Sequence, residues 1–212
     1  MQEVLHFLGS LTDSKQILEY VIQYGLWVVV LIVFAENGLF FAFFLPGDYL
    51  LFLTGLFGGT NKLPQTAFTL IMSIWAGAVL GSLVGYLTGR YFGNNLQSRK
   101  DSWFFKKERI DNTQEFFNKH GSKALIICRF LPVVRTFTPI LVGIIKMPYR
   151  TFLPLNLIGG AIWVAAMVGG GYFLGEHFPA LANYVQYIIL FFLAITTFTV
   201  VKGYIDLRRR KA

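Results

Sequence analysis

The chain has 212 residues, of which 55% are hydrophobic, 17% aromatic and only 14% charged, and its formal net charge is +8. A soluble domain of this length has too little interior to hide so much apolar surface, so the composition excludes an ordinary soluble globular protein. We expect an all-α membrane protein that forms a single membrane domain over residues 1–212.

Six apolar stretches follow one another along the chain, and several approach the roughly 20 residues that cross about 30 Å of hydrocarbon. Four predict transmembrane helices, and two contain proline and predict shorter elements. The first 19 residues lack the basic start, apolar centre and cleavage site of a signal peptide, so we expect no removable leader. The predicted spans are Ile17–Ala35, Gln65–Gly89, Thr151–Gly175 and Tyr184–Val201, and the interrupted stretches are Gly38–Gly59 and Ala124–Ile145.

Two basic segments predict the orientation of the chain. Residues 90–123 hold eight Lys or Arg against four acids, and residues 202–211 hold five against one. The positive-inside rule places both segments, and with them the C-terminus, in the cytoplasm. Ala124–Ile145 then starts and ends inside and predicts a re-entrant hairpin at about 124–145, while a first hairpin at about 36–59 dips in from outside. Because a full span of opposite direction follows each hairpin, we expect an inverted repeat.

The tripeptide Phe-Leu-Pro marks the predicted tip of both hairpins. It occurs in Phe44-Leu45-Pro46-Gly47-Asp48 and, 86 positions later, in Arg129-Phe130-Leu131-Pro132-Val133-Val134-Arg135. A broken helix persists at membrane depth only where protein or a watery cavity satisfies the freed backbone groups. We therefore predict helix breaks at Pro46, Gly47, Pro132 and Pro139, beside a polar pathway through the membrane.

Four ionisable residues lie in or beside the predicted hairpins: Glu36, Asp48, Arg129 and Arg135. Each charge at the bilayer centre costs about 2.5 to 3.5 kcal/mol, so these groups must be paired, hydrated or neutralised. Several structural roles are open. Asp48 can cap the half-helix after the turn, Glu36 can lie at the membrane interface, and the arginines can snorkel or bond to carbonyls opened by Pro132. The acids and arginines can also pair with one another.

The same four residues suit a transport site. Burial favours the protonated form of a carboxyl, which makes Glu36 and Asp48 candidates for binding and releasing a proton. Arg129 and Arg135 stay charged and can grip a phosphate in a bidentate fork, with the Thr136 hydroxyl beside them. The residues thus predict a phosphate-bearing substrate with proton coupling, and a groove open to the bilayer would leave a lipid tail outside.

Two further segments have predicted packing roles. The segment 101–120 is expected to be an amphipathic helix on the inner leaflet, where its basic residues face anionic lipid rather than nucleic acid. Glycines recur at every fourth position of the Gln65–Gly89 span and just beyond it, which predicts a face pressed against a neighbouring helix. These are Gly77, Gly81, Gly85, Gly89 and Gly93.

At these residues the chain resembles the DedA family of membrane proteins, also called the SNARE-associated or VTT group. The resemblance implies two facing re-entrant hairpins and, for bacterial members, a flippase that moves undecaprenyl phosphate across the cytoplasmic (inner) membrane with the proton gradient. By position, Glu36 and Asp48 match the family's essential acids, and Arg129 and Arg135 its essential arginines. Phe40-Phe41 and Val142 depart from close relatives. The matching pieces are Glu36-Asn37-Gly38, Pro46-Gly47-Asp48, Tyr86 through Gly93, Arg129 through Thr136, and Gly143 with Met147.

Two other classes of function stay open: a proton-coupled exporter of a soluble solute, and an intramembrane lipid-phosphate enzyme. The enzyme would need a nucleophile such as Asp48, because no paired histidines or activated serine accompany the arginines. We expect no enzyme, cofactor or metal, since His6, His120 and His177 lack metal-ligand spacing. The expected partners are a polyprenyl phosphate or other anionic lipid, protons and membrane lipids, and the sequence leaves the oligomeric state open.

Overall fold

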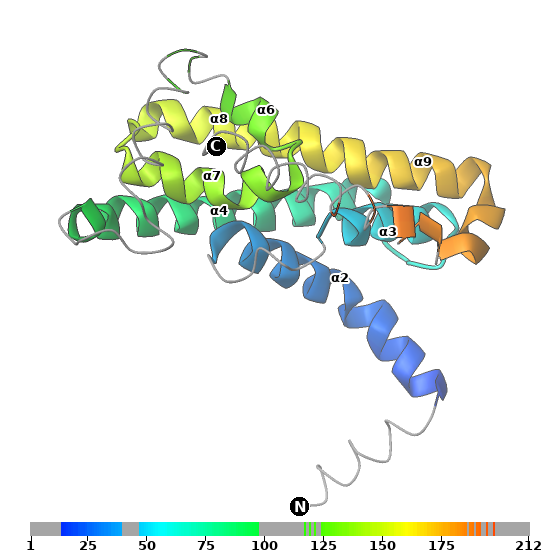
Figure 1. The fold of residues 1–212 in the computed structure, drawn as a ribbon. Helices are drawn as coiled ribbons and strands as arrows, with labels where there is room; N and C mark the ends of the chain where they lie inside the picture. The colour runs from blue at the N-terminus through cyan, green and yellow to red at the C-terminus, as the bar shows by residue number, and fades with distance from the viewer. Residues whose placement is uncertain are drawn as a thin grey trace, which may run out of the picture.

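The computed structural model describes residues 14–39, 47–97, 117, 119, 121, 124–185, 187, 188, 190, 191, 194 and 197. These residues form helices joined by short turns, and the described part contains no strand (Figure 1). The elements in chain order are α2 (Ser14–Gly38), α3 (Gly47–Gly59), α4 (Ala67–Gln97), α6 (Ala124–Cys128), α7 (Pro132–Ile144), α8 (Tyr149–Val164), the π-helical segment η2 (Ala165–Gly169), α9 (Gly170–His177) and the 3₁₀ segment η3 (Pro179–Tyr184).

Two helices of the described part are long and apolar enough to cross a membrane. One is Ala67–Tyr91 within α4, and the other is Tyr149–His177, which joins α8, η2 and α9. They coincide with two of the four predicted spans, so the all-α membrane fold is confirmed at this level. The predicted span Ile17–Ala35 falls within α2, and Tyr184–Val201 lies mostly outside the described residues. The total of four spans stays a prediction.

Each of the two predicted hairpin regions contains a short helix, and the two helices are equal in length. Both α3 and α7 have 13 residues, too few to cross a bilayer. The chain turns at Arg129–Leu131 between α6 and α7, where Leu131 is extended (φ −101°, ψ 107°) and Pro132 begins the new helix. Proline suits this first position because its missing N–H would have no helical partner there. Gly47 likewise begins α3, and Pro46 lies outside the described residues.

The predicted helix break at Pro139 is wrong. Helix α7 continues through Pro139 to Ile144. The hydroxyl of the adjacent Thr138 donates to the Val134 carbonyl at 2.6 Å, which adds a side-chain bond to the turn that proline weakens. The proline ring also lies close to Gly85 of α4, so tertiary contact supports the turn.

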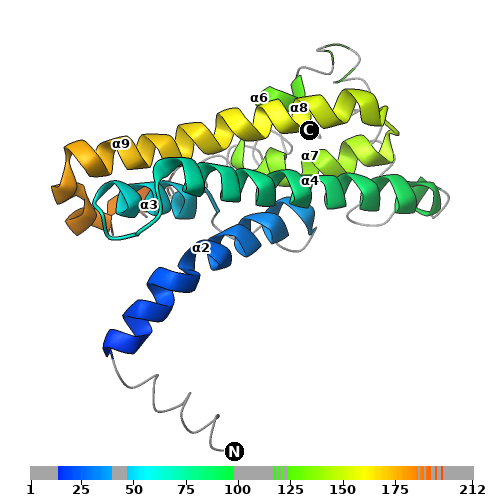
Figure 2. The same cartoon turned by 180° about the vertical axis from the view of Figure 1, so that it is seen from behind.

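Each half-helix packs mainly against one long helix: α7 against α4, and α3 against α9. In Figures 1 and 2, α7 lies between α4 and α8, and α3 lies toward the opposite end of the bundle. Glycines permit these contacts: a Cβ at Gly89 of α4 would overlap the Ile140 carbonyl of α7, and a Cβ at Gly175 of α9 would overlap the Leu56 carbonyl of α3. The predicted role of the glycine ladder in close packing is confirmed, although its N-terminal part serves a different neighbour, because Gly81 packs on Phe34 of α2.

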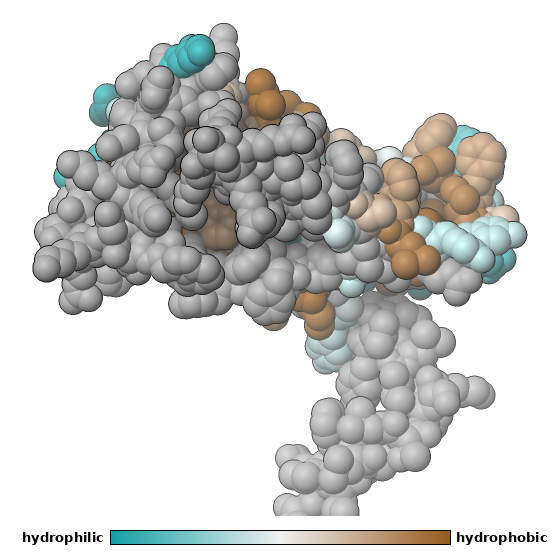
Figure 3. All heavy atoms as spheres, viewed as in Figure 1, coloured by the Kyte–Doolittle hydropathy of each residue, from teal (hydrophilic) through white to brown (hydrophobic). Residues whose placement is uncertain are grey.

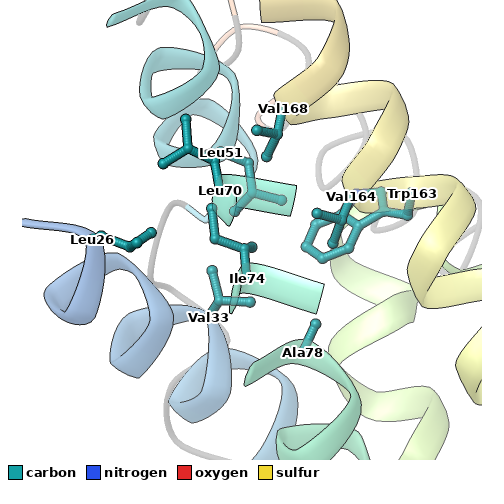
Figure 4. Packing of buried hydrophobic residues seen from close by; sticks show 9 residues of the cluster. All are labelled: Leu26, Val33, Leu51, Leu70, Ile74, Ala78, Trp163, Val164 and Val168. Carbon is teal, nitrogen blue, oxygen red and sulfur yellow. The ribbon is translucent and has the colours of Figure 1, made fainter. Parts of the chain in front are cut away.

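An apolar core joins the helices at the α3 end of the bundle. Side chains from α2, α3, α4, α8 and η2 meet there, as Figure 4 shows for Val33, Leu51, Ile74, Trp163 and Val168. Large hydrophobic side chains also face outward. Trp27 is 62% and Phe68 73% exposed, and brown hydrophobic areas lie on the described surface in Figure 3. An apolar exterior of this kind is expected of a helix bundle in lipid. Of the predicted amphipathic segment 101–120, nearly all lies outside the described residues.

Candidate functional site

Arg135 of α7 joins both acidic residues predicted from the sequence. One of its terminal nitrogens, Nη2, donates to Glu36 Oε1, and the other, Nη1, donates to Asp48 Oδ1. Glu36 lies in the last turn of α2 and Asp48 in the first turn of α3, so three separate elements meet at one guanidinium. The side chains of Arg135 and Glu36 are 3% and 2% exposed, and that of Asp48 is 18% exposed. We call these three residues the carboxylate–arginine cluster.

Trp163 of α8 completes this cluster. Its indole Nε1 donates to Asp48 Oδ1 at 3.2 Å, and its ring centre lies 4.4 Å from Arg135 Cζ, in the range of a cation–π contact. A Cβ at Gly47 would overlap the Glu36 carboxylate, so this glycine lets the start of α3 approach the acid closely. Glu36 Oε2 is buried and has no hydrogen-bond partner among the described residues.

Arg129 lies in different surroundings, although it is also buried. It sits in the turn between α6 and α7, where its Nη2 donates to Ser82 Oγ of α4 at 3.0 Å and to Asn156 Oδ1 of α8. The Asn156 amide donates in turn to the Val79 carbonyl at 3.2 Å, which fixes the orientation of its side chain. Both partners of Arg129 are neutral, and no described carboxylate bonds to it.

A small cavity separates the two arginines. Arg129, Arg135, Thr138 and Asn156 line it together with apolar side chains. It has room for about one water molecule. The site therefore contains two buried guanidinium groups on one enclosed space, one neutralised by carboxylates and the other bound by neutral oxygens.

The fold thus brings together most of the residues predicted from the sequence. Glu36, Asp48 and Arg135 are in direct contact, which realises the mutual pairing left open above. Snorkelling of Arg129 is wrong, because it is only 6% exposed and bonds to side chains inside the protein. Glu36 is only 2% exposed, and its depth in the membrane stays open. Thr136 is buried directly after Arg135 on α7.

Sequence reasoning missed three residues of the site: Ser82, Asn156 and Trp163. Asn156 gave a usable signal, because it is an amide within the otherwise apolar stretch Thr151–Gly175. Ser82 directly follows a glycine of the ladder, where a small residue already has a packing explanation. Nothing in the sequence distinguishes Trp163 from the chain's other tryptophans.

Comparison with known proteins identifies the family. The VTT domain matches residues 45–173. Protein DedA of Escherichia coli strain K12 is 36% identical over 196 residues, which cover 91% of this chain and 88% of DedA. Inner membrane protein YqjA of the same strain is 36% identical over 152 residues, which cover 71% of this chain and 67% of YqjA.

A membrane protein of Mycobacterium leprae strain TN is 38% identical over 167 residues, which cover 79% of this chain and 73% of that protein. No solved structure is significantly similar to the chain. These relatives bear the names of membrane or inner membrane proteins, or of DedA itself, in agreement with the apolar helices described above. The chain is a membrane protein that contains a VTT domain and belongs to the DedA family.

Proposed function

We propose that this protein is a flippase that moves a lipid phosphate, such as undecaprenyl phosphate or a related phospholipid, across the bacterial cytoplasmic membrane with proton coupling. One observation carries the proposal: the buried Glu36 and the partly buried Asp48 share a single guanidinium, and a second buried guanidinium beside them bonds to no described carboxylate. The C-terminus is expected in the cytoplasm.

The charge balance of the site links a proton to an anion. Glu36, Asp48, Arg129 and Arg135 carry formal charges that cancel when all four are ionised. When either acid takes up a proton, one positive charge is left over, and a bound phosphate monoanion restores the balance. Because buried net charge is costly, a proton and an anion should favour each other's binding, which is the thermodynamic basis of coupled transport.

The surface beside Arg129 suits a lipid tail that stays in the bilayer. Ile127, Phe130 and Leu131 flank the arginine in α6 and the following turn, and they are 67%, 45% and 44% exposed. An apolar rim next to a buried cation allows the phosphate to enter the protein while the hydrocarbon chain remains outside. The described chemistry is that of binding and movement, with no covalent step.

Reconstitution into vesicles tests the proposal. Labelled polyprenyl phosphate is added to vesicles that contain the protein, and its appearance in the opposite leaflet is measured with and without an imposed proton gradient. We expect gradient-dependent movement by the parent chain. Glu36→Gln and Asp48→Asn should lose the response to the gradient and retain more of the binding, because each removes a proton-binding group and preserves the guanidinium groups.

Control vesicles contain Asn183→Asp, which adds a charge at an exposed residue far from the site in sequence. Three outcomes would contradict the proposal: no lipid movement by the parent, release of inorganic phosphate from the lipid, or proton-coupled flux of a soluble solute without a polyprenyl phosphate. The second would indicate an enzyme, and the third an exporter.

A further inference from the structure

We propose that Arg129, which is held by Ser82 and Asn156, binds the phosphate of the substrate. Asn156 is the positioning residue that orients the Arg129 guanidinium for this binding. The inference rests on the proposed function and divides the labour between its two arginines. In this division Arg135 belongs to the carboxylate–arginine cluster, which binds the proton, and Arg129 binds the phosphate monoester.

The first argument is the difference in counter-charge. Arg135 is bound by two carboxylates and covered by the Trp163 ring. Arg129 is only 6% exposed and bonds to a hydroxyl and an amide oxygen, while the charged group that acts most strongly on it is Arg135, a like charge. A buried cation without an adjacent anion is unfavourable, so an anionic ligand gains more free energy at Arg129 than at Arg135.

The second argument is a free donor beside a cavity. Arg129 Nη1 is buried and has no hydrogen-bond acceptor among the described residues. The same side chain lines the small cavity, together with Asn156, Thr138 and Arg135. The unpartnered donor of Arg135 is its inner nitrogen Nε, because both of its terminal nitrogens bond to carboxylates. Arg129 Nη2 is occupied by Ser82 and Asn156, whereas both N–H groups of Nη1 can donate to phosphate oxygens without breaking those bonds.

The cavity is smaller than a phosphate group, so binding must open it. Arg129 lines the cavity from the turn between α6 and α7, and the next two residues of this turn, Phe130 and Leu131, are each nearly half exposed. Movement of this turn would let the phosphate reach Nη1 and leave Asn156 in place on α8. Asn156 itself is fully buried and anchored to the Val79 carbonyl, as a fixed support requires.

The first test gives Arg129 a carboxylate partner. In Asn156→Asp, a carboxylate oxygen replaces the amide oxygen that Arg129 now contacts, and the hydrogen bond of the amide to the Val79 carbonyl is lost. We expect farnesyl monophosphate to bind at least about tenfold more weakly to the purified full chain, because the added carboxylate competes with the phosphate. Isothermal titration calorimetry in detergent measures the affinity. Asn183→Asp makes the same chemical change at an exposed position and should bind as the parent does.

Two other probes identify the source of the phosphate. Farnesol lacks the phosphate and should not bind measurably to Arg129, while inorganic phosphate should bind more weakly than farnesyl monophosphate. Equal affinity for the two phosphates would mean that Arg129 binds free phosphate, which would support the binding site and contradict the proposed lipid transport. Unchanged affinity of Asn156→Asp for farnesyl monophosphate would overturn the inference.

The second test compares the arginines by stability and applies even if Asn156→Asp fails to fold. Arg129→Gln removes a cation without an adjacent anion, so the thermal midpoint without ligand should be unchanged or higher, and the gain on adding farnesyl monophosphate should vanish. Arg135→Gln leaves the buried Glu36 and the partly buried Asp48 without their cation and should lower the midpoint by about 5 °C or more. If Arg129→Gln lowers the midpoint as much as Arg135→Gln does, Arg129 is a structural residue and the inference is wrong.

These binding and melting measurements need no transport. A parent chain that moves lipid while both tests fail would retain the proposed function and refute the assignment to Arg129. If the parent chain binds farnesyl monophosphate through Arg129 but does not move lipid, phosphate binding at Arg129 is supported and the proposed flippase function is refuted.

Discussion

A single side chain can hold three helices together at this site because of the shape of the guanidinium group. The two terminal nitrogens of Arg135 point to different carboxylates, and its Cζ lies 4.4 Å from the centre of the Trp163 ring. A lysine at this position would offer a compact ammonium without a planar face, so it could not reproduce the stacked, forked arrangement. The bonds are strong in a dry site, yet their main consequence is geometric: they fix where α2, α3 and α7 meet.

Trp163→Phe tests whether the indole N–H matters for coupling. The change removes the 3.2 Å bond to Asp48 and keeps an aromatic face for Arg135. We expect a loss of about 1 kcal/mol in stability and a weaker response of lipid movement to the proton gradient, because Asp48 loses a hydrogen-bond donor that holds its carboxylate in place. Thermal melting and the vesicle measurement provide the two readings.

Trp75→Phe is a matched control for this change. Trp75 Nε1 donates to the Leu157 carbonyl at 3.0 Å, so its replacement also removes one indole bond. The stability loss should be similar and the gradient response unaltered. Equal damage to coupling in both variants would show that Trp163 contributes only packing.

At the scale of the helices, the sequence predicted elements best where a local cause acts alone. Pro132 begins α7 as expected, since no neighbouring contact is needed to explain a proline at a first helical position. Pro139 resembles it in sequence, but contact with Gly85 and a bond from Thr138 keep the helix continuous. The π-helical turn of η2 had no local signal either. It lies where the Val168 carbonyl meets Gly55 of α3, a contact between distant parts of the chain.

Gly89→Ala tests the glycine contact between α4 and α7. A Cβ at Gly89 would overlap the Ile140 carbonyl, and a backbone atom cannot move aside as a flexible side chain can. We expect α7 to be displaced and the thermal midpoint to fall by an amount equivalent to about 1 to 3 kcal/mol, with loss of lipid movement because α7 carries Arg135.

Gly170→Ala is the control within the same class of substitution. No atom lies within 4 Å of a Cβ built at Gly170, and alanine is the better helix former. Its midpoint should be equal to or higher than that of the parent. A loss as large as that of Gly89→Ala would mean that glycine itself, rather than close packing, is needed in these helices.

At the scale of the whole molecule, charges were predictable and their neutral partners were not. Four charged residues interrupt apolar sequence: Glu36, Asp48, Arg129 and Arg135. Placing a charge in lipid costs free energy, so such residues stand out in the sequence as candidates for a site. Asn156 is harder to interpret, because one amide in an apolar helix has many possible neighbours. The glycine ladder showed that α4 has a close neighbour and could not show which one, since the pairing of α4 with α7 depends on the path of the entire chain.

The expected inverted repeat can be tested at the two ends of the α8–α9 helix. Arg150 and Glu176 are exposed near its opposite ends, and the helix between them is 29 residues long from Tyr149 to His177, enough to cross the bilayer with some tilt. Cys128 is the only cysteine, so Cys128→Ser gives a background without thiols. In that background, Arg150→Cys should react with a membrane-impermeant maleimide only from the cytoplasmic side, and Glu176→Cys only from the outside. The positive-inside rule requires this order, because the basic residues before α8 belong to the cytoplasmic face. Labelling of both positions from one side would mean that the helix does not cross the membrane, and the two half-helices would then not enter from opposite faces.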